Sequence, residues 1–197
     1  MQIIDTSKVN IMLDLETLST HANAAIVSLG AVFFDDEKLI DDFYCAVSVS
    51  SNINNRRHIA ADTLVWWMRQ SNEARALFND AKAISIKQCL IDFQTWCLAC
   101  RKDIDTDTSS LAQSDIMLWG NGSDFDNVIL ADAYTQFHYR QPWEFNNNRC
   151  FRTLKNIYSC VEKPKRQQDI KHNALDDAYA QVKHLWLINN AMKQCGC

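Results

Sequence analysis

A short apolar stretch interrupted by two acidic residues constrains this chain more than any other feature. Residues 11–17 read IMLDLET, with Asp14 and Glu16 two positions apart. Side chains on a β-strand alternate between faces, so both carboxylates point to one face and the apolar side chains point to the other: Ile11, Leu13 and Leu15. Two like charges about 4 Å apart repel by roughly 4 kcal/mol at an effective dielectric constant of about 20. A bound divalent cation would offset this repulsion; the alternative is an edge strand whose polar face meets water.

Size and charge restrict the class of protein. The 197 residues predict one domain, spanning 1–197, with a single sizeable core. A hydrophobic content of 47% with only four Gly and two Pro argues against disorder. Because the net charge is −4, nucleic-acid binding would have to rest on a local basic patch. The N-terminal residues lack a signal-peptide pattern and no apolar run approaches membrane-spanning length, so we expect a cytoplasmic protein outside the membrane.

Changes in hydrophobic period predict an α/β domain with a mixed central sheet. The first three strands are expected to form an antiparallel meander: 8–17, 24–35 and 38–48. A short fourth strand is expected at 116–119. Helices are expected in five segments, the first with Asp62 as its N-cap: 61–78, 84–101, 123–137, 152–161 and 173–192. Two polar stretches are expected to be connections: 103–114 and 162–171.

The eight cysteines allow a competing interpretation. Cys97 and Cys100 form a CxxC pair, and Cys195 and Cys197 form a CGC at the end of the sequence. These pairs could hold zinc, but the first lies in an expected helix and the second on a tail. Without a secretion signal, we expect reduced thiols.

The fourth strand leads into GNGSDFDNVIL, which adds two acidic residues. Gly120 and Gly122 permit a tight turn, and Asp124 and Asp126 follow at the start of the expected helix. With Ser123 as N-cap, Asp126 would be the acidic N3 residue of a weak capping box. The spacing alone slightly favours capping over function.

The last expected helix opens with HNALDDAYAQ. Successive helical residues project about 100° apart, so its two aspartates cannot both face one site. With Asn173 as N-cap, Asp176 is the N3 residue and caps the backbone, which leaves Asp177 for another role. His172 lies just outside the helix and could approach whatever Asp177 holds, although a single histidine before a helix is more often structural.

Together, the DxE pair on the first strand, an aspartate after a later strand and the final HxxxxD resemble the DEDDh branch of the DnaQ-like 3′–5′ exonuclease superfamily. That superfamily has a ribonuclease H-like fold. The chain is most similar to the small bacterial and phage 3′–5′ exoribonuclease family that includes RNase AS. Five segments carry this resemblance over most of the chain, in the family's order: DLETLSTHANAAIVSLGAVFFD, LVWWMRQSNEAR, LWGNGSDFDNVILADAY, the PW…R…RTL pattern and HNALDDAYAQ.

The resemblance assigns chemical roles to individual residues. The Phe-Asp that ends the family's second motif selects Asp126 over Asp124, and the third motif makes His172 the general base. The motifs imply four metal-ligating carboxylates: Asp14, Glu16, Asp126 and Asp177. Hard cations such as Mg²⁺ or Mn²⁺ prefer oxygen ligands. Two of them can clamp the attacking water and the leaving 3′ oxygen of a phosphodiester, while a histidine removes the water's proton at neutral pH.

Three residues from two segments are predicted to contact the substrate. Thr17 and Leu18 match the stretch that makes this contact in the superfamily. Trp66 and Trp67 are adjacent on an expected helix, so at most one ring can sit squarely in the core. We assign Trp67 to stacking on a base, with buried packing as the alternative.

A basic segment is predicted to contact phosphates. It includes Arg149 and Arg152, which we assign to substrate binding, and five further basic residues: Lys155, Lys163, Lys165, Arg166 and Lys171. A solvated surface helix and loop is the alternative interpretation.

The sequence thus predicts a two-metal 3′–5′ exonuclease that releases nucleoside 5′-monophosphates from the 3′ ends of RNA or single-stranded DNA, using Mg²⁺ or Mn²⁺. Two alternatives remain: a non-catalytic nucleic-acid-binding module on the same fold, and a phosphatase of small phosphate esters. The sequence does not decide between RNA and DNA, and it leaves a homodimer open.

Overall fold

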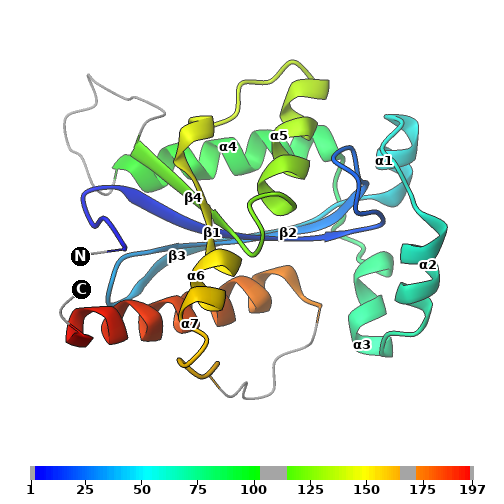
Figure 1. Cartoon of the computed structure of the whole chain (residues 1–197). Helices are drawn as coiled ribbons and strands as arrows, with labels where there is room; N and C mark the ends of the chain where they lie inside the picture. The colour runs from blue at the N-terminus through cyan, green and yellow to red at the C-terminus, as the bar shows by residue number, and fades with distance from the viewer. Residues whose placement is uncertain (1–2, 103–114, 165–171, 196–197) are drawn as a thin grey trace.

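The computed structural model describes residues 3–102, 115–164 and 172–195. Within these residues, five strands form one mixed sheet of order β3-β2-β1-β4-β5 (Figure 1). The strands are β1 (Val9–Thr17), β2 (Ile26–Phe34), β3 (Leu39–Ala46), β4 (Ile116–Gly120) and β5 (Asn148–Cys150). β1, β2 and β3 pair antiparallel, whereas β4 lies parallel to β1 and β5 lies parallel to β4. The expected mixed α/β sheet with an antiparallel beginning is confirmed.

Helices cover both faces of the sheet (Figure 1). α4 (Ile86–Lys102) and α5 (Asp126–Gln136) lie over one face, and α6 (Phe151–Ile157) and α7 (Ala174–Cys195) lie over the other. Short helices gather at one end of the molecule: α1 (Val49–Asn54), α2 (Ala61–Met68), α3 (Asn72–Arg75) and the 3₁₀ turn η1 (Ala76–Asn79). A further 3₁₀ turn, η4 (Phe145–Asn147), precedes β5. None of the described helices is long and apolar enough to cross a membrane.

β1 is a central strand, so the edge-strand interpretation of IMLDLET is wrong. It lies between β2 and β4, and its odd-numbered residues enter the core beneath α4 and α5: Ile11, Leu13 and Leu15. Met12 faces the other way, into a second apolar cluster with Val182 and Leu185 of α7. Since apolar layers bury both faces, the two carboxylates of β1 share a buried face, next to α7.

The local structure corrects several expectations. The predicted helix 61–78 is divided, because the Ser71 side chain accepts a hydrogen bond from the Ala74 amide and starts α3 anew. Asp62 lies in the first turn of α2 and is not its cap. α1 and β5 were not predicted, since each is too short to show a period.

The structure places both cysteines of the CxxC pair in the hydrophobic core. Cys97 and Cys100 of α4 are buried in the apolar cluster against the sheet, where packing accounts for their burial. Cys197 and the expected loop 103–114 lie outside the described residues.

Candidate active site

Four carboxylates from distant parts of the chain converge at one end of β1. Asp14 and Glu16 belong to β1, Asp126 is the first residue of α5, and Asp177 lies in the first turn of α7. The backbone amide of Leu15 donates a hydrogen bond to Asp126 Oδ1 at 3.2 Å, which ties α5 to β1. The structure therefore brings together all four carboxylates that the sequence motifs identify.

A glycine in β2 lets α7 reach this site. Gly30 pairs with Asp14 across the two strands. A Cβ atom built on Gly30 would lie 2.2 Å from the Leu175 amide nitrogen and 2.3 Å from the Ala174 carbonyl carbon. Because any larger residue would collide with this backbone, Gly30 allows the start of α7 to rest on the sheet beside Asp14.

The convergence of like charges raises the pKa of the carboxyl groups. Burial, followed by the nearby charges of Asp126, Glu16 and Asp177, holds the pKa of Asp14 well above its ordinary value. Burial, with Asp177 and Asp126, raises the pKa of Glu16 from 4.5 to about 8. Burial likewise raises the pKa of Asp126 to about 7, opposed by the Leu15 amide. Such shifts indicate a site that would gain stability from a bound cation.

His172 completes the cluster. Its ring nitrogens and the carboxylate oxygens of Glu16 and Asp177 include three atoms that all lie within 4.8 Å of one another. The ring packs edge-on against Trp66, with 4.8 Å between the ring centroids. The backbone of His172 has φ +65°, a left-handed conformation that is uncommon for residues other than glycine and is enriched at functional sites.

The first residues of α5 and α7 show which aspartate of each neighbouring pair belongs to the carboxylate cluster. α5 begins at Asp126, with no side-chain cap before it, so the predicted capping box with Ser123 is wrong and Asp126 is not an N3 residue. At α7, Asn173 Oδ1 accepts hydrogen bonds from the amides of Leu175 and Asp176 at 3.1 and 3.2 Å, which confirms Asn173 as the N-cap. Asp177 then faces the carboxylate cluster, one residue beyond the N3 position.

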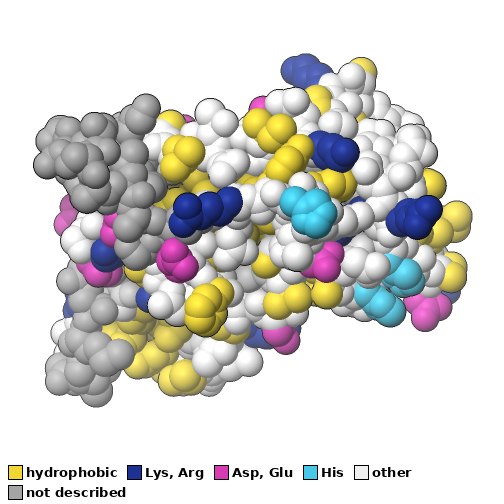
Figure 2. All heavy atoms as spheres, turned by 90° about the horizontal axis from the view of Figure 1, so that it is seen from above, with side chains coloured by type: hydrophobic (Ala, Val, Ile, Leu, Met, Phe, Trp, Pro, Cys, Tyr) yellow, Lys and Arg dark blue, Asp and Glu magenta, His cyan; other side chains and the backbone are white. Residues whose placement is uncertain are grey.

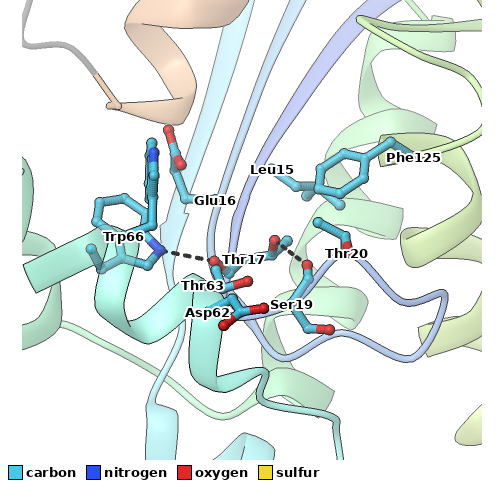
Figure 3. A pocket seen from close by; sticks show the side chains of 10 residues that line it. Leu15, Glu16, Thr17, Ser19, Thr20, Asp62, Thr63, Trp66 and Phe125 are labelled. Atoms are coloured by element: carbon cyan, nitrogen blue, oxygen red, sulfur yellow. Dashed lines mark hydrogen bonds between the residues drawn. The ribbon is translucent and has the colours of Figure 1, made fainter.

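A pocket of about 400 Å³, here called the aromatic pocket, opens beside Glu16. Figure 3 shows Trp66 and Phe125 on opposite walls, with Thr17 between them. The Thr17 hydroxyl donates to the Ser19 carbonyl at 2.7 Å, and the Thr17 carbonyl accepts from the Trp67 indole at 2.9 Å. These bonds fix the backbone that forms the floor of the pocket.

The structure changes two of the predicted nucleotide contacts. Trp67 also lines the aromatic pocket but is only 3% exposed, so it chiefly packs and holds Thr17, whereas Trp66 is 41% exposed and presents the open ring. Leu18 is 1% exposed, packs in a small cluster with Trp67 and Val27, and is not among the residues that line the pocket. The Leu18 side chain therefore packs beneath the site and does not open into the pocket.

The two predicted arginine contacts also differ. The Arg149 guanidinium donates to the carbonyls of Asn146 and Asn148 and to Met117 Sδ, each at 3.1 Å, so these local contacts hold it in place. Arg152 is exposed. Its charge lowers the pKa of Asp126, which indicates that its guanidinium lies close to the site. Both arginines stay predictions as phosphate contacts. Lys165, Arg166 and Lys171 lie outside the described residues.

The donor set fits hard divalent cations. Four carboxylates supply oxygen ligands. One oxygen each of Glu16 and Asp177, together with a ring nitrogen of His172, already lie within 4.8 Å of one another, close enough to hold an ion. Burial, followed by the neighbouring carboxylates, raises the pKa of Asp14 and Glu16, and a bound cation would offset both effects.

Sequence reasoning missed two residues that shape this site. Gln181 Nε2 donates to Asp14 Oδ1 at 2.7 Å. It follows Asp177 by four positions, a spacing that places both on one helix face and could have indicated its role. Gly30 carried the other signal, an isolated glycine inside a strand, which often marks a close backbone approach.

Comparisons with known proteins agree with this geometry. The family model of the 3′–5′ exoribonuclease Rv2179c-like domain matches residues 9–188. No curated protein matches the sequence.

Among solved structures, the chain is similar to an E. coli exonuclease I–single-stranded DNA complex with bound zinc, at 16% identity and a TM-score of 0.61 over 94% of this chain and 41% of that one. Another exonuclease I structure gives 14% identity and a TM-score of 0.62 over 95% and 43%. Cell-death related nuclease 4 gives 12% and 0.53 over 93% and 64%. The chain thus spans less than half the length of exonuclease I, and the likeness confirms the expected ribonuclease H-like fold.

Proposed function

The chain belongs to the Rv2179c-like family of 3′–5′ exoribonucleases. We propose that it hydrolyses the last phosphodiester bond at the 3′ end of RNA or single-stranded DNA and releases nucleoside 5′-monophosphates. The observation that carries this proposal is the convergence of His172 with the four carboxylates at one end of β1. The single-stranded DNA bound to E. coli exonuclease I in its crystal structures supports a single-stranded substrate.

The carboxylates would hold two divalent cations, Mg²⁺ or Mn²⁺. When bound, these ions would supply charge stabilisation for the attacking water and for the leaving 3′ oxygen. Asp14, Glu16, Asp126 and Asp177 hold their oxygens on a framework of three elements, β1, α5 and α7. Gln181 fixes one oxygen of Asp14, which leaves the other to face the site.

His172 would accept the proton of the attacking water. Its ring is held between the carboxylates and Trp66, and its left-handed backbone turns it toward Glu16 and Asp177. The aromatic pocket would bind the terminal nucleoside, with Trp66 and Phe125 as stacking surfaces and Thr17 at the floor. This arrangement would leave the scissile phosphate beside the carboxylates.

A gel assay of 5′-labelled RNA and DNA oligomers with Mg²⁺, Mn²⁺ or excess chelator tests the proposal. We expect a ladder of products shortened from the 3′ end, which is lost in chelator. Binding without cleavage under all metal conditions would favour a non-catalytic binding module. Hydrolysis of a nitrophenyl phosphate ester without cleavage of the oligomers would favour a phosphatase.

A further inference from the structure

A second, smaller cavity lies on the other side of the carboxylates from the aromatic pocket. It has a volume of about 100 Å³ and lies between α6 and α7; we call it the α6–α7 cavity. Asp177 lines this cavity and Glu16 lines the aromatic pocket, and their oxygens lie within 4.8 Å. Each cavity is therefore lined by one member of the carboxylate cluster.

The α6–α7 cavity is lined by basic groups. Lys155 projects from α6 and Lys163 from the segment that follows it. Lys155 Nζ donates to Asn121 Oδ1 at 2.8 Å and lies 5.6 Å from the centre of the Phe151 ring, so the ammonium group is held in place. Burial and the charges of Arg152 and Lys163 lower the pKa of Lys155, as expected for a cation with like charges beside it. A bound anion would relieve that repulsion.

Two buried polar side chains of α7 form the floor. His184 is 8% exposed, and its Nε2 donates to the Val161 carbonyl at 3.1 Å, which ties α7 to the segment that carries Lys163. Gln181 is 7% exposed and donates to Asp14, while its Oε1 has no hydrogen-bond partner in the described part of the chain. Both residues line the cavity, so its lining combines these polar groups with Lys155, Lys163 and the carboxylate of Asp177.

The size of the α6–α7 cavity limits what it can hold. Its volume of about 100 Å³ is about a quarter of that of the aromatic pocket, about 400 Å³. This difference in size favours a small group such as a phosphate over a nucleoside. The pairing of lysines at this cavity is not repeated on the face over α4 and α5, where Figure 2 shows Lys and Arg side chains apart from one another.

We propose that the α6–α7 cavity binds one phosphate group of the substrate strand, upstream of the scissile bond. This inference rests on the proposed function. With the terminal nucleoside in the aromatic pocket and the scissile phosphate at the carboxylates, the strand continues past Asp177 toward Lys155 and Lys163. Neutralising a backbone phosphate with lysine releases counterions, so the contact would contribute to binding without reading the base.

A single variant isolates this contact. Lys155→Met keeps the aliphatic stem against Phe151 and removes the charge. Lys87→Met is the matched control, because Lys87 Nζ also lies over an aromatic ring, 5.3 Å from the centre of Phe137. Lys87 belongs to α4, which lies over the opposite face of the sheet. We expect Lys155→Met to lower kcat/KM for an oligomer by about tenfold and to reduce the slope of log(kcat/KM) against log[salt] by about one. Lys87→Met should change neither, and Lys155→Arg should retain most of the activity.

Oligomers with one neutral methylphosphonate linkage locate the phosphate. One upstream position should reduce cleavage by the wild type about tenfold and cause no further loss in Lys155→Met. Equal cleavage of every oligomer by Lys155→Met and Lys87→Met would overturn the inference, whereas no cleavage by the wild type would contradict the proposed function itself.

Inhibition by inorganic phosphate tests whether the cavity binds free phosphate instead of a phosphate group of the strand. If the strand occupies the cavity, free phosphate should compete with it there, so inhibition by millimolar phosphate should weaken in Lys155→Met and the oligomers should also show the sensitive linkage. Inhibition that is lost in Lys155→Met, with no sensitive linkage in the oligomers, would assign the α6–α7 cavity to free phosphate and refute the strand contact.

Discussion

Replacing Glu16 by glutamine should stabilise the metal-free protein, and the effect should depend on pH. The pKa of Glu16 is raised from 4.5 to about 8 by burial and by Asp177 and Asp126. Between these values the folded protein binds more protons than the unfolded chain, so stability falls as pH rises through this window. At about 1.4 kcal/mol per pKa unit, this group costs roughly 3 kcal/mol at pH 7 and less than about 1 kcal/mol at pH 5.

Thermal unfolding in excess chelator measures this difference. For a chain of this size, roughly 3 kcal/mol corresponds to an increase in Tm of about 6–12 °C at pH 7, with a much smaller increase at pH 5. Glu37→Gln is the control, because Glu37 is exposed in the turn between β2 and β3. Added Mg²⁺ or Mn²⁺ should raise the Tm of the wild type more than that of Glu16→Gln. An increase that is equal at pH 5 and pH 8, or equal for both variants, would refute the electrostatic argument.

Substitutions at three of the predicted site residues, two of them paired with a control at a neighbouring aspartate, test the site further. Asp126→Ala should nearly abolish cleavage while Asp124→Ala retains it, since Asp126 alone joins the cluster; the opposite result in a gel assay would reverse this assignment. Asp177→Asn should abolish activity with little loss of stability, whereas Asp176→Ala should cost about 1 kcal/mol or less in chemical denaturation, through the helix start, and stay active. His172→Ala should lose roughly 10²–10⁴-fold in single-turnover rate and retain substrate binding. If its rate and its profile from pH 5.5 to 9 match the wild type, His172 is structural.

Local sequence patterns determined much of the fold. The alternation in IMLDLET identified β1 and the opposite faces of Asp14 and Leu15, because strand geometry fixes side-chain direction over two residues. The position of Asn173 before ALDD identified the start of α7, because capping depends on neighbouring residues alone. The family motifs selected the residues that the structure brings together at the site.

Only the tertiary structure decided how those residues are supported. Burial of β1 between α4 and α7 raised the carboxyl pKa values, and no pattern within the strand records which elements cover it. Of two adjacent tryptophans with the same local chemistry, packing against Leu18 and Val27 buried Trp67 and left Trp66 open.

The roles of Arg149 and Gln181 and the lining of the α6–α7 cavity were likewise decided by the tertiary structure and not by local sequence. Arg149 and Lys155 look alike in a basic segment, but their surroundings hold one on backbone carbonyls and place the other beside Asp177. Gln181 acquires its contact with Asp14 only because Gly30 lets α7 rest on β2. Sequence specifies which groups a chain carries and which way they point locally, whereas desolvation and long-range contact arise only when distant elements pack together.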